Sequence, residues 1–93
     1  MGRRFSLTLH ATKGKMLEFA ATIGGRVVIS GDGSRAWTYS TDELPNEPVE
    51  VRVFATGVAG AEYAIAGALP GIEQGFVWRH TLSATVQSVA FHV

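Results

Sequence analysis

Cysteine is absent from the chain, so no disulfide staples its core and no thiolate is available as a nucleophile or metal ligand. No apolar run approaches the ~20 residues that a membrane-spanning helix needs, so we expect no membrane span. Charged residues are few and balanced, with eight basic and eight acidic side chains scattered along 93 residues. Nucleic-acid-binding proteins normally carry a basic stripe, and the lack of one argues against a nucleic-acid partner.

A helical apolar stripe is also lacking, and apolar and polar residues instead alternate with a period of two, as in half-buried β-strands. The expected strands span 4–11, 16–23, 26–30, 35–40, 49–56, 63–69, 76–82 and 87–93. Seven or eight short strands separated by turns are typical of an antiparallel sandwich or barrel. We therefore predict one all-β domain over residues 1–93 with one of these two antiparallel architectures.

Three hairpins are predicted between consecutive strands: 4–11 with 16–23, 26–30 with 35–40, and 76–82 with 87–93. Matching the apolar faces of these strands sets three pairs of residues side by side: Leu9 and Phe19, Val28 and Trp37, and Trp78 and Phe91. The Thr41–Pro48 segment between strands is polar and contains two prolines, so we expect a loop there. Leu69-Pro70-Gly71 predicts a type II turn.

The segment Ile29–Trp37, ISGDGSRAW, is the first stretch that looks like a chemical site. A P-loop requires a lysine after its second glycine, and a nucleophile elbow requires a serine between glycines at a strand-to-helix turn. Neither pattern is present. Asp32-Gly33 is a preferred dipeptide of type I′ turns, so we interpret it as the turn of the second hairpin.

Metal sites have only weak candidates. Asp32, Asp42 and Glu43 are the carboxylates considered for a composite calcium site at one rim of the domain. The three histidines lie in three different strands without the short spacing of zinc ligands: His10, His80 and His92. We predict no cofactor, and no serine or acid is spaced to complete a catalytic triad.

The segment Val58–Ile65, VAGAEYAI, resembles the tyrosine corner of fibronectin type III and immunoglobulin-like domains. In that corner a turn leads into an acid–tyrosine pair, and the tyrosine hydroxyl bonds to the backbone a few residues upstream. The resemblance implies an immunoglobulin-like or fibronectin-III-like Greek-key sandwich, although the immunoglobulin cysteines are absent. Likeness of fold implies nothing about function.

Two aromatic side chains form the best lead to a small-molecule ligand. Trp37 and Tyr39 lie two residues apart in one expected strand, so they share a face. Such a pair is either part of the core or an exposed platform on which sugar rings stack. The small neighbours Ala36 and Thr38 on the other face favour the core.

Phe54 falls on the polar face of its strand, beside Arg52, and other strands also carry apolar residues on both faces. A two-sheet sandwich has one core, so the second apolar area is expected to meet another chain. We therefore predict a non-catalytic interaction module that binds a protein partner or self-associates. The alternatives are a carbohydrate-binding module using Trp37 and Tyr39, and a small metal-dependent hydrolase using His80.

Overall fold

The computed structural model describes residues 2–68 and 75–93. Eight strands, and no helix, are found in this part of the chain. They are β1 (Arg3–Lys13), β2 (Met16–Ile23), β3 (Arg26–Asp32), β4 (Trp37–Leu44), β5 (Glu50–Gly57), β6 (Glu62–Ala68), β7 (Gly75–Thr81) and β8 (Val86–His92). The predicted type II turn at Leu69-Pro70-Gly71 lies outside the described residues.

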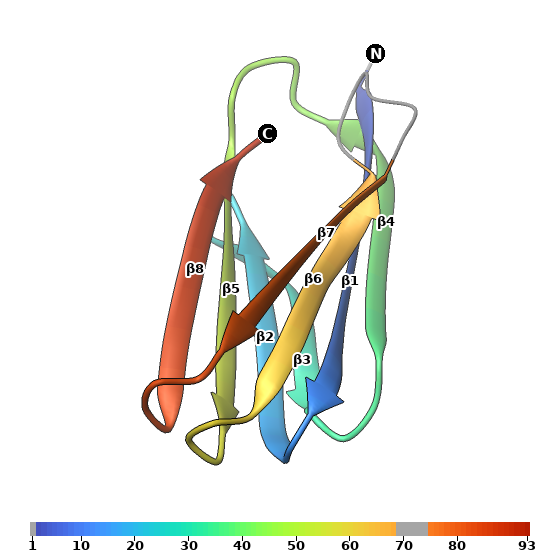
Figure 1. Ribbon diagram of the computed structural model, residues 1–93. Helices are drawn as coiled ribbons and strands as arrows, with labels where there is room; N and C mark the ends of the chain where they lie inside the picture. The colour runs from blue at the N-terminus through green and yellow to red at the C-terminus, as the bar shows by residue number, and fades with distance from the viewer. Residues whose placement is uncertain (1, 69–74) are drawn as a thin grey trace.

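The strands form two four-stranded sheets that face each other (Figure 1). Sheet A has the order β4-β1-β6-β7 and sheet B the order β3-β2-β5-β8, and every pairing is antiparallel. The predicted all-β sandwich architecture is therefore confirmed. Among the described residues there is no helix that is long and apolar enough to cross a membrane.

The three predicted hairpins are wrong, although their strands exist. β1 and β2 belong to different sheets, as do β3 and β4, and β7 and β8. The apolar faces that we matched meet across the core, and not side by side within one sheet. Trp78 and Phe91 show this directly, because their rings touch edge to face with centroids 4.8 Å apart although β7 and β8 share no ladder.

The predicted type I′ turn at Asp32-Gly33 is also wrong. Such a turn requires positive φ at both central residues, and neither Asp32 nor Gly33 has one. The segment carries the chain from sheet B to sheet A. A hairpin turn joins β2 to β3 at Gly24-Gly25, with φ of 58° and 83°. The glycine pair is a hairpin signal that our prediction used only as a break.

The core lies between the sheets and is made by the inward faces of the central strands. Its largest fully buried side chains are Tyr63, Phe5, Phe19, Leu7, Leu9, Leu44, Ile65, Leu82, Val51 and Val53. Alternation from the inward-facing Phe19 would also turn Leu17 inward, but Leu17 is 49% exposed, whereas Met16 is buried. The β2–β5 register shifts between Met16 and Glu18, and this bulge reverses which of the two neighbours points inward.

Tyr63 is buried in β6 and contacts Phe19 and His80, with ring centroids 5.9 and 5.6 Å away. Its hydroxyl has no hydrogen-bond partner in the described part of the chain. The bond from the hydroxyl to the upstream backbone, which defines a tyrosine corner, is therefore not among the described contacts. The likeness of this segment to the fibronectin and immunoglobulin corner stops at the sequence.

Replacing Tyr63 by phenylalanine tests this description. A buried hydroxyl without a partner costs about 1–3 kcal/mol, so we expect Tyr63→Phe to stabilise the fold or leave it unchanged. Burial raises the pKa of Tyr63 above its ordinary value of 10.0. Above pH 10.0 the Tyr63 phenol loses its proton in the unfolded chain but keeps it in the folded chain. The free energy of unfolding is therefore unaffected by this group below pH 10.0 and decreases as the pH rises further.

Chemical denaturation at neutral and alkaline pH measures both effects. Tyr63→Phe should lose less of its free energy of unfolding at alkaline pH than the wild-type protein does. A Tyr39→Phe control should lose as much as the wild-type protein. A destabilisation by Tyr63→Phe at neutral pH would mean that the hydroxyl does make a hydrogen bond.

Candidate functional site

Trp37 and Tyr39 point inward from β4, an edge strand of sheet A. Both side chains are half-buried and pack against the core, whereas Thr38 and Ser40 between and after them are exposed. The predicted alternation of this strand is thus correct, and its exposed face is the polar one. The pair lies along the seam where β4 of sheet A faces β3 of sheet B.

Trp37 closes one end of this seam. Its indole ring lies so close to the backbone of Gly31 in β3 that a Cβ at Gly31 would collide with the ring. The indole Nε1–H donates a 2.7 Å hydrogen bond to the carbonyl oxygen of Asp32, and the Arg35 guanidinium carbon stands 4.9 Å from the ring centroid. These contacts tie the edges of the two sheets together through one side chain.

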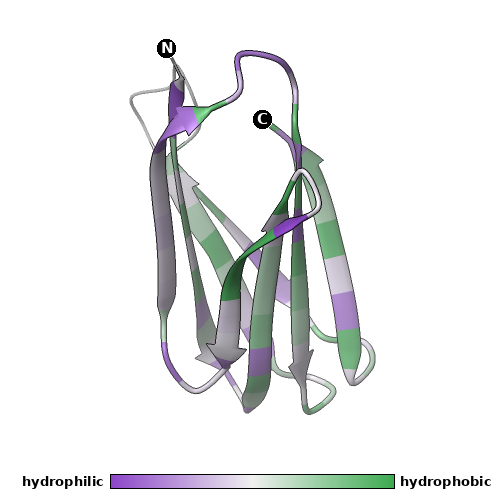
Figure 2. Ribbon diagram, turned by 180° about the vertical axis from the view of Figure 1, so that it is seen from behind, coloured by the Kyte–Doolittle hydropathy of each residue, from purple (hydrophilic) through white to green (hydrophobic). Residues whose placement is uncertain are grey.

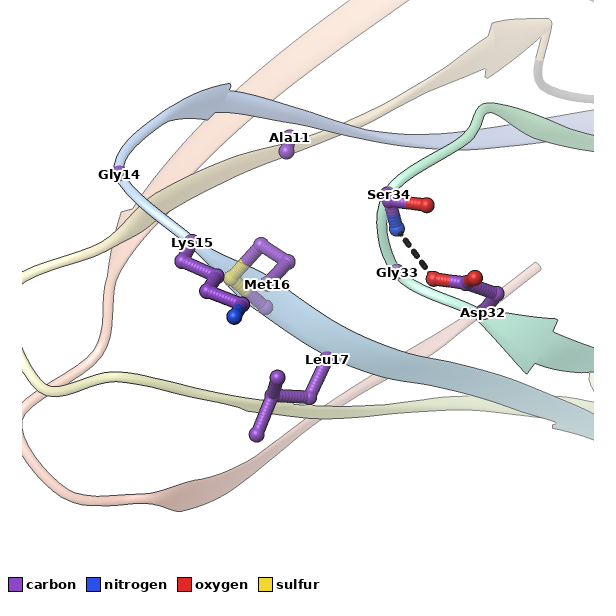
Figure 3. A pocket seen from close by; sticks show the side chains of 8 residues that line it. All are labelled: Ala11, Gly14, Lys15, Met16, Leu17, Asp32, Gly33 and Ser34. Carbon is purple, nitrogen blue, oxygen red and sulfur yellow. Dashed lines mark hydrogen bonds between the residues drawn. The ribbon is translucent and has the colours of Figure 1, made fainter.

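The connection after β3 holds its own shape by local hydrogen bonds. The Asp32 carboxylate accepts a 2.8 Å bond from the Ser34 N–H (Figure 3), and the Gly33 N–H donates to the carbonyl oxygen of Leu17. Hydrogen bonds from Ser34, the backbone bond foremost, hold the pKa of Asp32 below its ordinary value, and Arg35 adds to the effect. The carboxylate of ISGDGSRAW therefore serves as the acceptor of a local turn.

An open depression of about 590 Å³ lies beside this connection (Figure 3). It is lined by Ala11, Gly14, Lys15, Met16, Leu17, Asp32, Gly33 and Ser34. Its two ionisable groups are one lysine and one aspartate, and the aspartate is engaged with Ser34. This lining lacks the paired acid, base and nucleophile that a catalytic site requires.

A second depression, of about 380 Å³, occupies the other end of the β3–β4 seam. It is lined by Ile23, Gly24, Arg26, Val28, Tyr39, Thr41, Glu43, Leu44, Pro45 and Val49. Of the two predicted ligand-binding aromatics, Tyr39 lines this hollow and Trp37 does not. The pair is divided between a closed and an open part of the seam, so the two rings do not form one exposed platform.

The candidate metal ligands are not brought together. Asp32 ends β3, whereas Asp42 and Glu43 lie near the end of β4 where Leu44 pairs with Arg3, at the opposite end of the sandwich (Figure 1). Asp42 forms a 2.9 Å exposed ion pair with Arg4. Within residues 2–68 and 75–93, no three histidine or acidic side chains gather as a metal site would require.

The histidines are also dispersed. His10 on β1 and His92 on β8 belong to different sheets, and His80 on β7 stacks against the buried ring of Tyr63. The Nε2 atom of His80 is buried without a hydrogen-bond partner in the described part of the chain. No carboxylate meets His80 there, so the structure provides no acid–base pair for the predicted hydrolase alternative.

The outer face of sheet B presents a different kind of site. Phe54 lies at its centre, and the ladder places Ala20 of β2 and Ser88 of β8 on its two sides. We call this surface the Phe54 face and define it by Ala20, Thr22, Ser30, Arg52, Phe54, Thr56, Val86, Ser88 and Ala90. The sequence alone places Phe54 on the polar face of its strand, and the register shows that the small side chains of Ala20 and Ser88 flank it.

Comparison with protein-family models, with curated protein sequences and with solved structures finds no significant match to this chain. Its function is therefore argued from its own residues. The described structure offers a closed seam at Trp37, two open depressions and a sheet face with an exposed phenylalanine at its centre.

The contact between Trp37 and Gly31 yields a testable prediction. In Gly31→Ala the new methyl group and the indole ring cannot occupy the same space, and overpacking of this kind costs about 1–3 kcal/mol. We expect a lower free energy of unfolding and a red-shifted emission as the ring moves toward water. Ser30→Ala on the outer face of the same strand is the control and should change neither quantity, and a Gly31→Ala variant that behaves like wild type would refute the contact.

Proposed function

We propose that this protein is a non-catalytic interaction module that binds a protein surface, another protein or a second copy of itself, through the Phe54 face. The observation that carries the proposal is the exposure of a phenylalanine at the centre of the outer face of sheet B. Phe54 keeps 37% of its surface in contact with solvent, and its cross-strand neighbours Ala20 and Ser88 are too small to cover it. Burying that ring against a partner would release the water around it.

The surroundings of Phe54 have the composition of a binding patch. Interfaces place apolar groups at the centre and polar groups at the rim. Arg52 and Glu50 form a 3.2 Å ion pair on one side of Phe54, and Glu18 lies on the other. Val86, which is exposed, pairs with Thr56 and widens the apolar area toward the edge of the sheet.

The charge balance supports the same function. The formal net charge is zero at pH 7, so two copies do not repel each other at long range. An exposed apolar patch on a chain of zero net charge promotes association with another protein surface.

We also propose that the sandwich is built from two Greek keys. In the first key, β2 and β3 are neighbours in sheet B, the chain crosses to β4 in sheet A, and β1 lies beside β4. In the second key, β6 and β7 are neighbours in sheet A, the chain crosses to β8 in sheet B, and β5 lies beside β8. This is the order in which a fourth strand returns beside a consecutive series of three. We do not extend the proposal to the immunoglobulin or fibronectin type III families, because the Tyr63 hydroxyl makes no corner hydrogen bond among the described residues.

The two alternatives from the sequence receive less support. Trp37 is held in the β3–β4 seam by Gly31 and Asp32, so it does not form an exposed platform for a sugar with Tyr39. The hydrolase alternative lacks a constellation of reacting groups in the described part of the chain.

Photo-crosslinking tests the proposed function. A benzophenone side chain at position 54 should give covalent adducts in the cells that produce the protein, because its ring would lie in the interface. The same group at position 77 is the control, since Val77 is 61% exposed but lies on the opposite sheet. An adduct of twice the chain mass identifies a second copy, and other masses identify another protein. Equal or no crosslinking at the two positions would contradict the proposal.

A further inference from the structure

We infer that β8 is a docking strand: it pairs edge to edge with β8 of a second copy, antiparallel across a two-fold axis, and joins the two B sheets into one. The inference goes beyond the proposed function, because it places a contact with a second copy at the edge of sheet B and not on the Phe54 face. β8 is the last strand of sheet B and pairs only with β5 in the described residues. Figure 1 shows it at the outer side of the sandwich with no strand beyond it.

The backbone groups that β8 offers at its free edge follow from its ladder. Val93 exchanges two 3.0 Å hydrogen bonds with Val49. In an antiparallel ladder such pairs recur at every second residue, and the β5–β8 register runs without a shift. Residues 91, 89 and 87 therefore turn their backbone groups toward β5. The N–H and C=O groups of alternate residues point away from the sheet: Val86, Ser88, Ala90 and His92.

β8 also lacks the features that keep other sheet edges apart. Proteins protect exposed edges with charged residues, prolines or bulges. Among the four edge strands, β3 contains Arg26 and Asp32, β4 contains Asp42 and Glu43, and β7 contains Arg79, whereas β8 contains no lysine, arginine, aspartate, glutamate or proline. Figure 2 shows mostly apolar and neutral colours along it.

The strand is complementary to itself. A two-fold axis at Val89 sets Ser88 opposite Ala90 of the partner subunit, and Val86 opposite His92 of the partner subunit. Both members of each pair carry free backbone groups, so every pair can exchange two hydrogen bonds. The same symmetry applied to β7 has its axis at Trp78 and sets Arg79 opposite Val77 of the partner subunit. The two Arg79 guanidinium groups would then lie diagonally across the axis on one face, where like-charge repulsion disfavours pairing.

The inner side of β8 is held in place before any partner arrives. Phe91 packs against Trp78 and Phe76 of β7, with ring centroids 4.8 and 6.1 Å away. The outer side continues the Phe54 face, because Ser88 lies directly beside Phe54. A docked second copy would therefore extend that face across the two-fold axis, and an edge that is already ordered loses little entropy on pairing.

Proline substitution at the free edge tests the inference. The Ala90 N–H points away from β5, so Ala90→Pro leaves the internal ladder intact but removes a donor of the new one. We expect the wild-type protein to dimerise at micromolar to millimolar concentration in sedimentation equilibrium. Ala90→Pro should raise the dissociation constant at least ~10-fold by losing paired hydrogen bonds.

The matched control is Val77→Pro on the β7 edge. Leu82 donates to the Ala61 carbonyl oxygen, and alternation along the unshifted β6–β7 register turns the Val77 N–H away from β6. Val77→Pro therefore carries the same backbone change at the other edge, and should leave the dissociation constant unchanged.

Amide hydrogen exchange tests the same dimer on the wild-type protein, so this test does not depend on whether a variant folds. The N–H groups of Ser88 and Ala90 should exchange slowly in the dimer and fast after dilution, whereas those of Val77 and Arg79 should not depend on concentration. A chain that stays monomeric to millimolar concentration, or concentration-independent exchange at Ser88 and Ala90, overturns the inference.

Phe54→Ser separates this inference from the proposed function. If Ala90→Pro abolishes the dimer and Phe54→Ser does not, the edge is the interface and the Phe54 face is not. If Phe54→Ser abolishes association and Ala90→Pro leaves it unchanged, the Phe54 face stands and the docking strand is overturned.

Discussion

The packing of one apolar sheet face against another is the interaction on which this structure depends. Phe5, Leu7 and Leu9 of β1 and Phe19 of β2 lie fully buried between the sheets. Without cysteine, the chain has no covalent link to hold the layers together. Burial of apolar surface is thus the main source of stability, at about 25 cal/mol for each Å² removed from water.

A two-layer sandwich leaves open seams where edge strands of different sheets face each other, and the chain fills each seam differently. Trp37 reaches across the β3–β4 seam to the backbone of Gly31 and to the Asp32 carbonyl oxygen. An aromatic cluster of Phe76, Trp78 and Phe91 fills the β7–β8 seam. Trp37, which suggests a ligand site from sequence alone, therefore serves to close the sandwich. Exposed apolar side chains lie on the outside of both sheets, such as Phe54 on sheet B and Val77 on sheet A.

The sequence predicted the strands and the orientation of most residues, because burial of alternate side chains is a local property of each strand. It did not predict pairing. Trp78 and Phe91 match equally well as neighbours in one sheet or as contacts across two sheets, and the short connection between them permits both. The bulge at Met16–Glu18 depends on pairing with β5, so it too could not be predicted from the sequence. The composite site of Asp32, Asp42 and Glu43 failed for the same reason, since the ends of strands cannot be located before the strands are paired.

The sheet order has a consequence for the rate of folding. The central ladder of sheet A joins Leu9 to Ile65, and that of sheet B joins Ala21 to Val53, so the main pairings link distant parts of the chain. Among the eight described strands, only the β2–β3 and β6–β7 pairs join strands that are consecutive in the chain. Because a chain loses entropy in closing long loops before distant contacts form, proteins of such topology fold in milliseconds to seconds. While it folds, the uncharged sequence of β8 is open to other nascent copies, so the sandwich faces a kinetic competition between completing its own sheet and joining a neighbour's.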